Sequence, residues 1–259
     1  MPEGVEVEIY RQRAELVVGR LATAVIAPDP WILKGVSAQQ VTDAVLGQKV
    51  EAARRRGKLL ILDWSNEVRM GIRFGMTGTL FVDGDAAIDQ LEYSSTRRDP
   101  AWDRFAIRFD DGGELRLHDP RRLGGINLDP DEDALGADAF SVTLGHLQKR
   151  IFVGKVAIKA RLLDQARLAG VGNLIADEVM WRAGLDPARQ ADSFTEAEQR
   201  RLHSHLRKVL TDFTRDGGSH TGKLHDSRQR GGHCPKDGME LLRREIGGRT
   251  TFSCPEHQV

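Results

Sequence analysis

The sequence predicts an α+β protein, with an N-terminal antiparallel β-sandwich and flanking helices followed by a C-terminal helical domain and a final hairpin. Short apolar runs separated by polar turns fill the first half. Beyond residue 133, apolar side chains recur every three or four residues instead. The chain has 259 residues, 40% of them hydrophobic, and can bury more than one core. We expect domains over 1–130, 131–220 and 221–259.

The first half begins with an expected helix and continues as strands. Helical spacing of apolar side chains runs from residue 6 to residue 16. Turns rich in Asp, Gly and Asn separate the strand-like runs that follow. These runs cover residues 22–26, 59–64, 68–74, 79–82, 105–109 and 114–118. Their spacing is typical of an antiparallel sandwich or barrel against which the helix packs.

Helices are expected in the second half, over residues 143–149, 160–165, 174–183 and 195–214. The last one opens with Thr195-Glu-Ala-Glu198, a capping box in which two side chains satisfy free backbone N–H groups. After residue 215 the chain is rich in Gly, His and Arg, and a short hairpin-like segment follows.

The composition favours an intracellular protein with no membrane partner. No run of eighteen apolar residues occurs, and the start has no basic stretch followed by an apolar one. The 38 basic and 38 acidic residues give a net charge of zero, which argues neither for nor against a nucleic-acid partner. Their distribution is more informative, because basic residues cluster at 54–58, at 121–122 and through the tail.

The start of the chain offers a reactive amine. Removal of Met1 would leave the secondary amine of Pro2, followed directly by the carboxylate of Glu3. An α-amino group has a reference pKa of about 7.7 to 8.0, so part of it is neutral at physiological pH and can form a Schiff base with a sugar carbon. The neighbouring carboxyl group can transfer protons. Taken alone, these residues are more often an arbitrary start, so the interpretation depends on other motifs.

Three further motifs combine basic and apolar side chains that suit contact with a nucleic acid. The basic run 54–58 enters an apolar strand and places Lys58 where it can meet a phosphate. Met76 lies in one glycine-containing loop, and Arg121 and Leu123 lie in another. An apolar wedge can replace lost stacking while an arginine binds the orphaned base. The alternatives are a solvated strand end for Lys58 and core packing for Met76.

Residues 158–178 predict a helix, a glycine turn and a second helix. Gly170 and Gly172 let the backbone approach a ligand closely. The second helix begins at Asn173, and its first N–H groups suit a phosphate. The segment therefore predicts a phosphate site.

Two clusters in the tail predict a metal site. Cys234 and Asp237 are separated by two residues, as are Cys254 and His257, with sixteen residues between the pairs. Zinc accepts thiolate, imidazole and carboxylate ligands in tetrahedral geometry. The alternatives are His233 in place of Asp237, a disulfide between the cysteines, or a metal-free hairpin of the same shape.

In this order the motifs resemble those of the formamidopyrimidine-DNA glycosylase and endonuclease VIII family over nearly the whole chain. The start Met-Pro-Glu-Gly-Val-Glu-Val-Glu is similar to the family's Pro-Glu-Gly/Leu-Pro-Glu-Val/Ile, with Val5 in place of a second proline. Leu123 stands for a usual phenylalanine and Ile175 for a usual tyrosine, while Asp237 and His257 stand for two cysteines. The resemblance implies a helix-two-turn-helix and a zinc-finger-like hairpin.

The resemblance also implies an activity: a bacterial DNA repair glycosylase that excises oxidised bases and nicks abasic sites by β,δ-elimination. Such an enzyme would act as a cytoplasmic, nucleoid-associated monomer on damaged double-stranded DNA, without a redox or nucleotide cofactor. The implied catalytic residues are Pro2, Glu3 and Lys58. The implied DNA-binding residues are Lys159, Asn173, Arg249, Met76, Arg121 and Leu123. Glu6 and Glu178 would support the site, and one structural zinc ion would bind Cys234, Asp237, Cys254 and His257.

Two other classes of function stay open on the sequence. A damaged-DNA binding protein with weak or lost base excision would account for the neutral net charge and the substitutions at Val5, Leu123 and Ile175; turnover against binding separates it from an enzyme. A tautomerase with an amino-terminal proline would use Pro2 but leaves the glycine turn and the tail unexplained. Salt-dependent binding would exclude it. By the resemblance, the segment 216–233 is shorter than the family's loop that covers an oxidised purine, which favours a lesion other than 8-oxoguanine.

Overall fold

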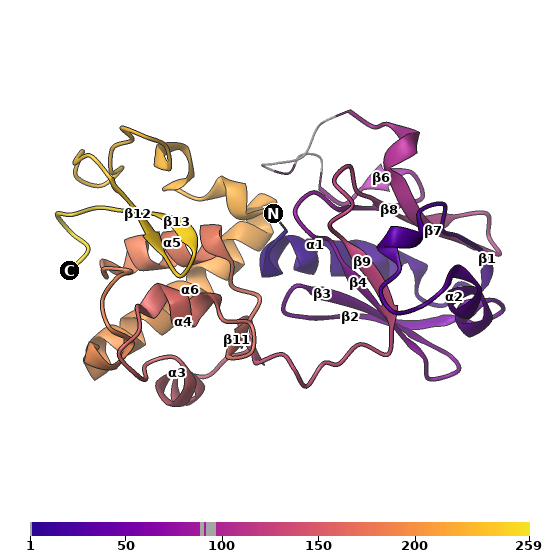
Figure 1. Ribbon diagram of the computed structural model, residues 1–259, viewed down its shortest axis with the longest axis horizontal. Coiled ribbons are helices and arrows are strands. Elements are labelled where there is room, and N and C mark those ends of the chain that lie inside the picture. The colour runs from indigo at the N-terminus through magenta and orange to yellow at the C-terminus, as the bar shows by residue number, and fades with distance from the viewer. Residues whose placement is uncertain (1, 89–90, 92–96) are drawn as a thin grey trace. The chain divides into compact units, whose positions relative to one another are not determined.

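The computed structural model describes residues 2–88, 91 and 97–259, which form two compact units (Figure 1). The first unit contains Pro2 and residues Glu6–Glu132, and the second contains Glu3–Val5 and Asp133–Val259. The helical region and the final hairpin, treated above as separate domains, thus fall in the same unit. The N-terminal residues Glu3–Val5 belong to the second unit as well.

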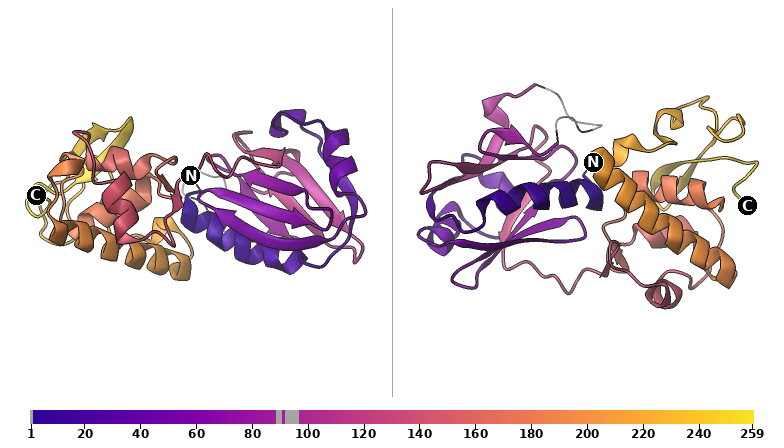
Figure 2. Two further views of the ribbon diagram at one scale, coloured as in Figure 1. Left: turned by 90° about the horizontal axis from the view of Figure 1, so that it is seen from below. Right: turned by 180° about the vertical axis from the view of Figure 1, so that it is seen from behind.

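Two antiparallel sheets build the first unit, and the predicted α+β class with an N-terminal sandwich is confirmed (Figure 2). The five-stranded sheet has the order β1 (Ala22–Ile26), β7 (Asp103–Phe109), β8 (Glu114–His118), β5 (Thr79–Val82), β6 (Asp85–Ala86). The four-stranded sheet has the order β2 (Val50–Arg56), β3 (Leu59–Trp64), β4 (Arg69–Arg73), β9 (Gly125–Leu128).

Helices α1 (Gly4–Ala14) and α2 (Ala38–Val45) contribute side chains to the core shared by both sheets. Short 3-10 turns lie at Glu15–Val17, Pro30–Ile32 and Pro100–Trp102. In this unit the sequence did not predict α2, β2, β6 or β9. Strand β2 escaped notice because it carries arginines, and Arg54 is accommodated by ion pairs with Asp63 and Glu132 at 2.6 Å each.

The second unit is mainly helical. Its helices are α3 (Leu144–Arg150), α4 (Ile158–Leu163), α5 (Asn173–Ala183) and α6 (Glu196–Asp216), with 3-10 turns at Ala191–Ser193, Ser219–Thr221 and His225–Ser227. Strands β10 (Ala137–Asp138) and β11 (Leu168–Ala169) pair in parallel, and β12 (Leu242–Ile246) and β13 (Arg249–Ser253) form the expected hairpin. The predicted capping box of Thr195 and Glu198 is present.

Helix α5 lies at the centre of this unit, with nearly all its side chains buried. Trp181 near its end packs with Cys234, Phe252 and Cys254 in a cluster beneath the hairpin. Among the helices of the described residues, none has both the length and the apolar character needed to cross a bilayer.

Candidate active site and nucleic-acid interface

Glu3 is held at the N-terminus of α5. Its two carboxylate oxygens accept hydrogen bonds from the backbone N–H groups of Leu174 at 2.9 Å and Ile175 at 3.1 Å. The side chain is almost fully buried, and the positive end of the helix dipole stabilises its negative charge. These two N–H groups were expected to meet a phosphate, but the chain's own carboxylate occupies them.

The glycine turn is shaped to receive the N-terminal segment. The N–H of Gly4 donates to the carbonyl of Gly170 at 2.8 Å. A Cβ atom on Gly172 would lie 2.2 Å from Cδ of Glu3, and one on Gly4 would lie 2.9 Å from the Gly170 oxygen. The predicted close approach is therefore made by the N-terminus itself. Because Glu3 and Gly4 are both anchored, Pro2 is one residue from a fixed point.

Lys159 is buried in a charged network below this turn. Its Nζ lies 2.5 Å from Oδ1 of Asp177 and 2.7 Å from Oγ1 of Thr251. Arg228 binds the other oxygen of Asp177 at 2.9 Å. Burial lowers the pKa of Lys159, while the charge of Asp177 opposes this effect. With its side chain fully buried, Lys159 contacts the hairpin in this structure, so its phosphate contact stays a prediction.

Asn173 is also connected to the hairpin. Its Nδ2 donates to the carbonyl of Thr250 at 3.0 Å. The preceding residue, Arg249, is the first residue of β13, and its side chain is exposed. Lys159 and Asn173 thus both contact the strand that carries Arg249. The three predicted phosphate-binding residues lie in one part of the second unit, with Arg249 the most exposed of them.

Glu178 and Asp177 hold two different segments. Glu178 accepts hydrogen bonds from the N–H groups of Lys223 at 3.1 Å and Leu224 at 2.9 Å, and it pairs with Arg182 at 2.7 Å. Asp177 binds Arg228 and Lys159 as described. The sequence analysis singled out Glu178 but missed Asp177 and Arg228. The available sequence signal was an acid, Asp177, among apolar residues of the second predicted helix, together with Lys159 in the first.

The loop that carries Met76 and the loop that carries Arg121 and Leu123, called the two reading loops below, pack directly on one another in the first unit. Thr77, beside Met76, donates to Asp119 at 2.6 Å. The same carboxylate accepts the N–H groups of Arg121 at 3.2 Å and Gly124 at 2.8 Å. Sequence reasoning missed Asp119, which organises both loops from its position two residues before Arg121.

The hydrogen bonds to Asp119 hold the backbone of the second loop and leave its tip, residues 121–123, exposed. Leu123 is 49% exposed, and it directly follows two arginines. Arg121 and Arg122 are exposed as well, and Met76 is half-buried. Arg122 has a φ of 57°, and its guanidinium binds Asp29 with two hydrogen bonds of 2.6 and 2.7 Å. The backbone is fixed while Arg121 and Leu123 face outward.

Lys58 and Glu6 lie elsewhere in the first unit. Lys58 is half-buried in the turn between β2 and β3, directly after the arginines of β2. Glu6 is buried in the first turn of α1.

The four tail residues converge as predicted. The ligand atoms of Cys234, Asp237, Cys254 and His257 all lie within 4.8 Å of one another. Sγ of Cys234 is 3.7 Å from Nδ1 of His257, and Sγ of Cys254 is 3.2 Å from Oδ2 of Asp237. These separations suit the edges of a tetrahedron around an ion with bonds of about 2.0 to 2.3 Å. The group can hold a metal, and both thiols are free rather than joined as a disulfide.

Contacts around the group orient its members. Nε2 of His257 lies 3.2 Å from the carbonyl of Trp181, which leaves Nδ1 toward the cluster. The indole N–H of Trp181 donates to the sulfur of Cys234 at 3.3 Å. His233, the alternative ligand, is exposed and pairs across the turn with Glu240. Asp237 therefore fits the ligand position, and His233 does not.

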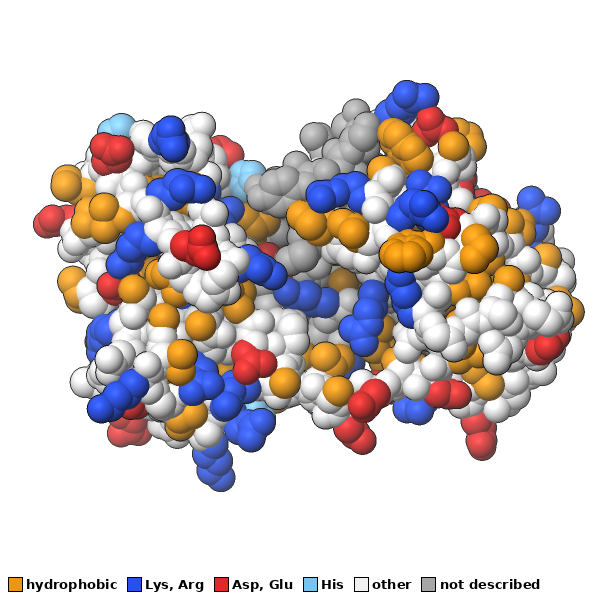
Figure 3. All heavy atoms as spheres, viewed as in Figure 1, with side chains coloured by type: hydrophobic (Ala, Val, Ile, Leu, Met, Phe, Trp, Pro, Cys, Tyr) orange, Lys and Arg blue, Asp and Glu red, His pale blue; other side chains and the backbone are white. Residues whose placement is uncertain are grey.

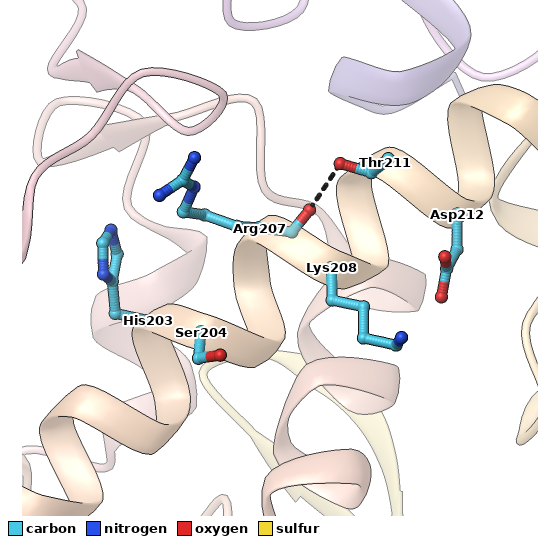
Figure 4. A pocket seen from close by; sticks show the side chains of 6 residues that line it. All are labelled: His203, Ser204, Arg207, Lys208, Thr211 and Asp212. Atoms are coloured by element: carbon cyan, nitrogen blue, oxygen red, sulfur yellow. Dashed lines mark hydrogen bonds between the residues drawn. The ribbon is translucent and has the colours of Figure 1, made fainter.

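A hollow of about 470 Å³ lies along α6, outside these residues (Figure 4). All six residues that line it belong to that helix, and His203, Arg207 and Lys208 make it basic. It includes none of the predicted site residues.

Comparisons with known proteins identify the family. Residues 1–126 match the family described as formamidopyrimidine-DNA glycosylase N-terminal domain, and residues 128–223 match its H2TH domain. A formamidopyrimidine-DNA glycosylase of Carboxydothermus hydrogenoformans is 31% identical over the full length of both chains. One from Arabidopsis thaliana is 29% identical and covers all of this chain and 71% of its own.

Solved structures share the fold. The Lactococcus lactis Fpg in complex with abasic-site DNA has a TM-score of 0.83 at 24% identity, covering 99% of each chain. The complex of the same protein with FAPY-dG DNA has a TM-score of 0.82 and covers 98% of each. The two units thus define a DNA repair glycosylase with a helix-two-turn-helix. The chain belongs to the formamidopyrimidine-DNA glycosylase family.

Proposed function

We propose that this chain excises oxidised bases from damaged duplex DNA and nicks the resulting abasic sites, with the amine of Pro2 as nucleophile. The observation that carries the proposal is the pair of hydrogen bonds from the N-terminus of α5 to the carboxylate of Glu3. These bonds fix the position of the residue that directly follows the amine of Pro2. An enzyme needs its nucleophile and its proton carrier in a defined mutual position.

The chemistry follows from these two residues. The nitrogen of Pro2 attacks C1′, the glycosidic bond breaks, and the base leaves with a proton. The sugar ring opens as the Schiff base forms, with the carboxyl group of Glu3 carrying protons. Loss of a proton at C2′ expels the 3′ phosphate, and a second elimination expels the 5′ phosphate. Water then hydrolyses the Schiff base and returns the free amine.

DNA would be held by residues of both units. Arg249 and the tip residues Arg121 and Leu123 are exposed and oriented by fixed backbone, which suits contacts with phosphates and with the gap left by an extruded base. Met76 would fill the same gap, and Lys58, Asn173 and Lys159 would bind or position phosphates. The Lactococcus lactis complexes contain abasic-site and FAPY-dG DNA, so we infer substrates of the same chemistry.

We further propose one structural zinc ion on Cys234, Asp237, Cys254 and His257. When bound, it would fix the hairpin that carries Arg249, since zinc in such sites supplies folding energy rather than chemistry. The mixed ligand set fits because the hydrogen bonds of Trp181 already orient both a thiol and the imidazole. As a monomer on DNA, the chain would work in the cytoplasm at the nucleoid.

Turnover tests the proposal against a damaged-DNA binding protein. Duplexes that each carry one oxidised base or one abasic site would be incubated with a tenth as much protein, and base release and strand nicks counted. Several turnovers per protein with β,δ-elimination ends are expected. Tight, salt-sensitive binding without turnover would contradict the enzyme and favour the binding protein.

A further inference from the structure

Trp31 is unusually exposed for a tryptophan. Its side chain is 63% exposed, whereas Trp64 and Trp181 are 0% and 3% exposed. Tryptophan is highly buried on average, so an indole with this exposure is a candidate contact residue once its surroundings are considered. The position is not one of the motifs that the function above uses.

The indole is presented by a rigid segment. Trp31 lies in the 3-10 turn Pro30–Ile32, whose cap Asp29 accepts the N–H of Trp31 at 3.1 Å. Ile32, the next residue, is fully buried and anchors the turn in the core. Nζ of Lys34 lies 4.8 Å from the centre of the indole ring and donates to the carbonyl of Trp31 at 2.6 Å. Little conformational freedom of this backbone would be lost on binding.

The same segment is bound to the second reading loop. Asp29 holds the guanidinium of Arg122 with two hydrogen bonds, and the N–H of Lys34 donates to the carbonyl of Ile126 at 2.8 Å. A Cβ on Gly125 would lie 2.7 Å from Cγ of Lys34, so the two segments are in close contact. Trp31 and Leu123 therefore belong to one connected surface of the first unit.

Exposed cations surround this surface. Lys34, Arg73, Arg121 and Arg122 are all exposed. The neighbouring acid, Asp29, is buried and neutralised by Arg122 and by Arg104 at 3.5 Å. Lys and Arg side chains are interspersed with hydrophobic ones over the face of the sandwich unit turned to the viewer in Figure 3. Positive charge beside an aromatic face matches a nucleic-acid strand, which offers phosphates and stacking surfaces together.

We propose that Trp31 is a DNA-contact residue: its indole packs on a nucleoside of the DNA strand that the 121–123 loop engages, while Lys34 binds the adjacent phosphate. This inference rests on the proposed function, because it takes DNA as the partner of that loop. It adds an aromatic contact outside the residues that the family motifs supply.

Affinity for an abasic-analogue duplex tests the contact. Trp31→Ala should weaken binding by roughly 5- to 100-fold, the range expected for loss of one base–aromatic contact. Trp31→Phe should recover most of that loss because a ring is kept. Leu46→Ala is the matched control, since Leu46 is 47% exposed in the same unit but is not part of this surface. Unfolding temperatures of all variants would be compared to exclude misfolding.

Tryptophan fluorescence gives a second readout that does not depend on affinity. Because Trp31 is the most exposed of the four tryptophans, we expect the duplex to shield it from iodide quenching and to quench part of its emission, and Trp31→Phe should abolish both changes. Unchanged affinity of Trp31→Ala, or iodide quenching unaffected by DNA, would overturn the inference and point to a protein partner. If the unaltered chain itself fails to bind or turn over damaged DNA, the proposed function fails instead.

Discussion

The glycine turn of the second unit and the reading loop of the first were both expected to meet DNA, yet they are built in opposite ways. At the turn, the N–H groups of Leu174 and Ile175 and the ammonium of Lys159 are engaged by Glu3, Asp177 and Thr251. At the loop, the backbone is held by Asp119 while Arg121 and Leu123 stay exposed. The turn is therefore a scaffold that anchors the chain's own N-terminus, whereas the loop leaves its side chains exposed, as the proposed DNA contact requires.

Removal of the buried ammonium should show the scaffold role most strongly. Lys159→Met should lower the free energy of unfolding by about 3–5 kcal/mol, because the buried Asp177 then loses one of its two charged partners among the described residues. Chemical denaturation measures the change. Lys155→Met, at an exposed position, is the control and should change stability little. Equal stability of the two variants would mean that Lys159 is no part of the scaffold.

A methyl group added in the glycine turn should show how much the rate of nicking depends on the position of Glu3. Gly172→Ala would put a methyl group 2.2 Å from Cδ of Glu3 and displace the carboxylate from its two N–H donors. We expect the single-turnover rate of nicking to fall about 100-fold, the lower range for loss of a proton carrier.

Gly145→Ala provides the comparison for Gly172→Ala, because nothing lies within 4 Å of an added Cβ at Gly145. It should nick at the normal rate. A Gly172→Ala enzyme with normal rates would show that the position of Glu3 is unimportant.

A matched pair of glycines tests the reading loops. Gly75 and Gly112 both have positive φ, 58° and 84°, but a Cβ on Gly75 would lie 2.4 Å from the backbone carbon of Leu123, and one on Gly112 would meet nothing within 4 Å. Gly75→Ala should weaken binding of damaged duplex about tenfold, since the packing of the loops must shift. Gly112→Ala should leave it unchanged, and equal losses would point to backbone strain alone.

The smallest expected effect concerns the start of α6, outside both regions. Hydrogen bonds from Arg189 and Thr195 lower the pKa of Glu198 to about 2 from 4.5, against the effect of burial. A carboxylate with a lowered pKa stabilises the fold fully above pH 4.5, and this contribution is lost as the pH falls toward 2.

Glu198→Gln should cost about 1 kcal/mol at neutral pH and flatten the pH dependence of stability in that window. Glu196→Gln, at an exposed position two residues earlier in the same first turn of α6, should retain the dependence. A pH profile that is the same in both variants would remove Glu198 from this role.

Local patterns predicted much of this molecule from sequence. Alternating apolar runs marked six of the strands, and the Thr195–Glu198 capping box marked the start of α6, because these signals lie within a few residues of one another. Each tail pair is local as well, with two residues between its members, and the structure brings the two pairs together into a group that can hold a metal.

What the sequence did not predict depends on partners distant along the chain. Nothing local shows that Glu3 caps α5, that Asp177 neutralises Lys159, or that Asp29 holds Arg122. Strand β2 was missed because its arginines find acids on other segments, and the exposed Trp31 has no sequence signal apart from its residue type.

Borohydride trapping tests the central claim, that the anchored N-terminus supplies the nucleophile. The chain, with removal of Met1 confirmed by mass spectrometry, would be reduced in the presence of an abasic-site duplex, and the adduct located by peptide mapping. We predict an adduct on the nitrogen of Pro2, sharply reduced in Gly172→Ala and normal in Gly145→Ala. An adduct on a lysine, or none despite tight binding to the same duplex, would contradict the account.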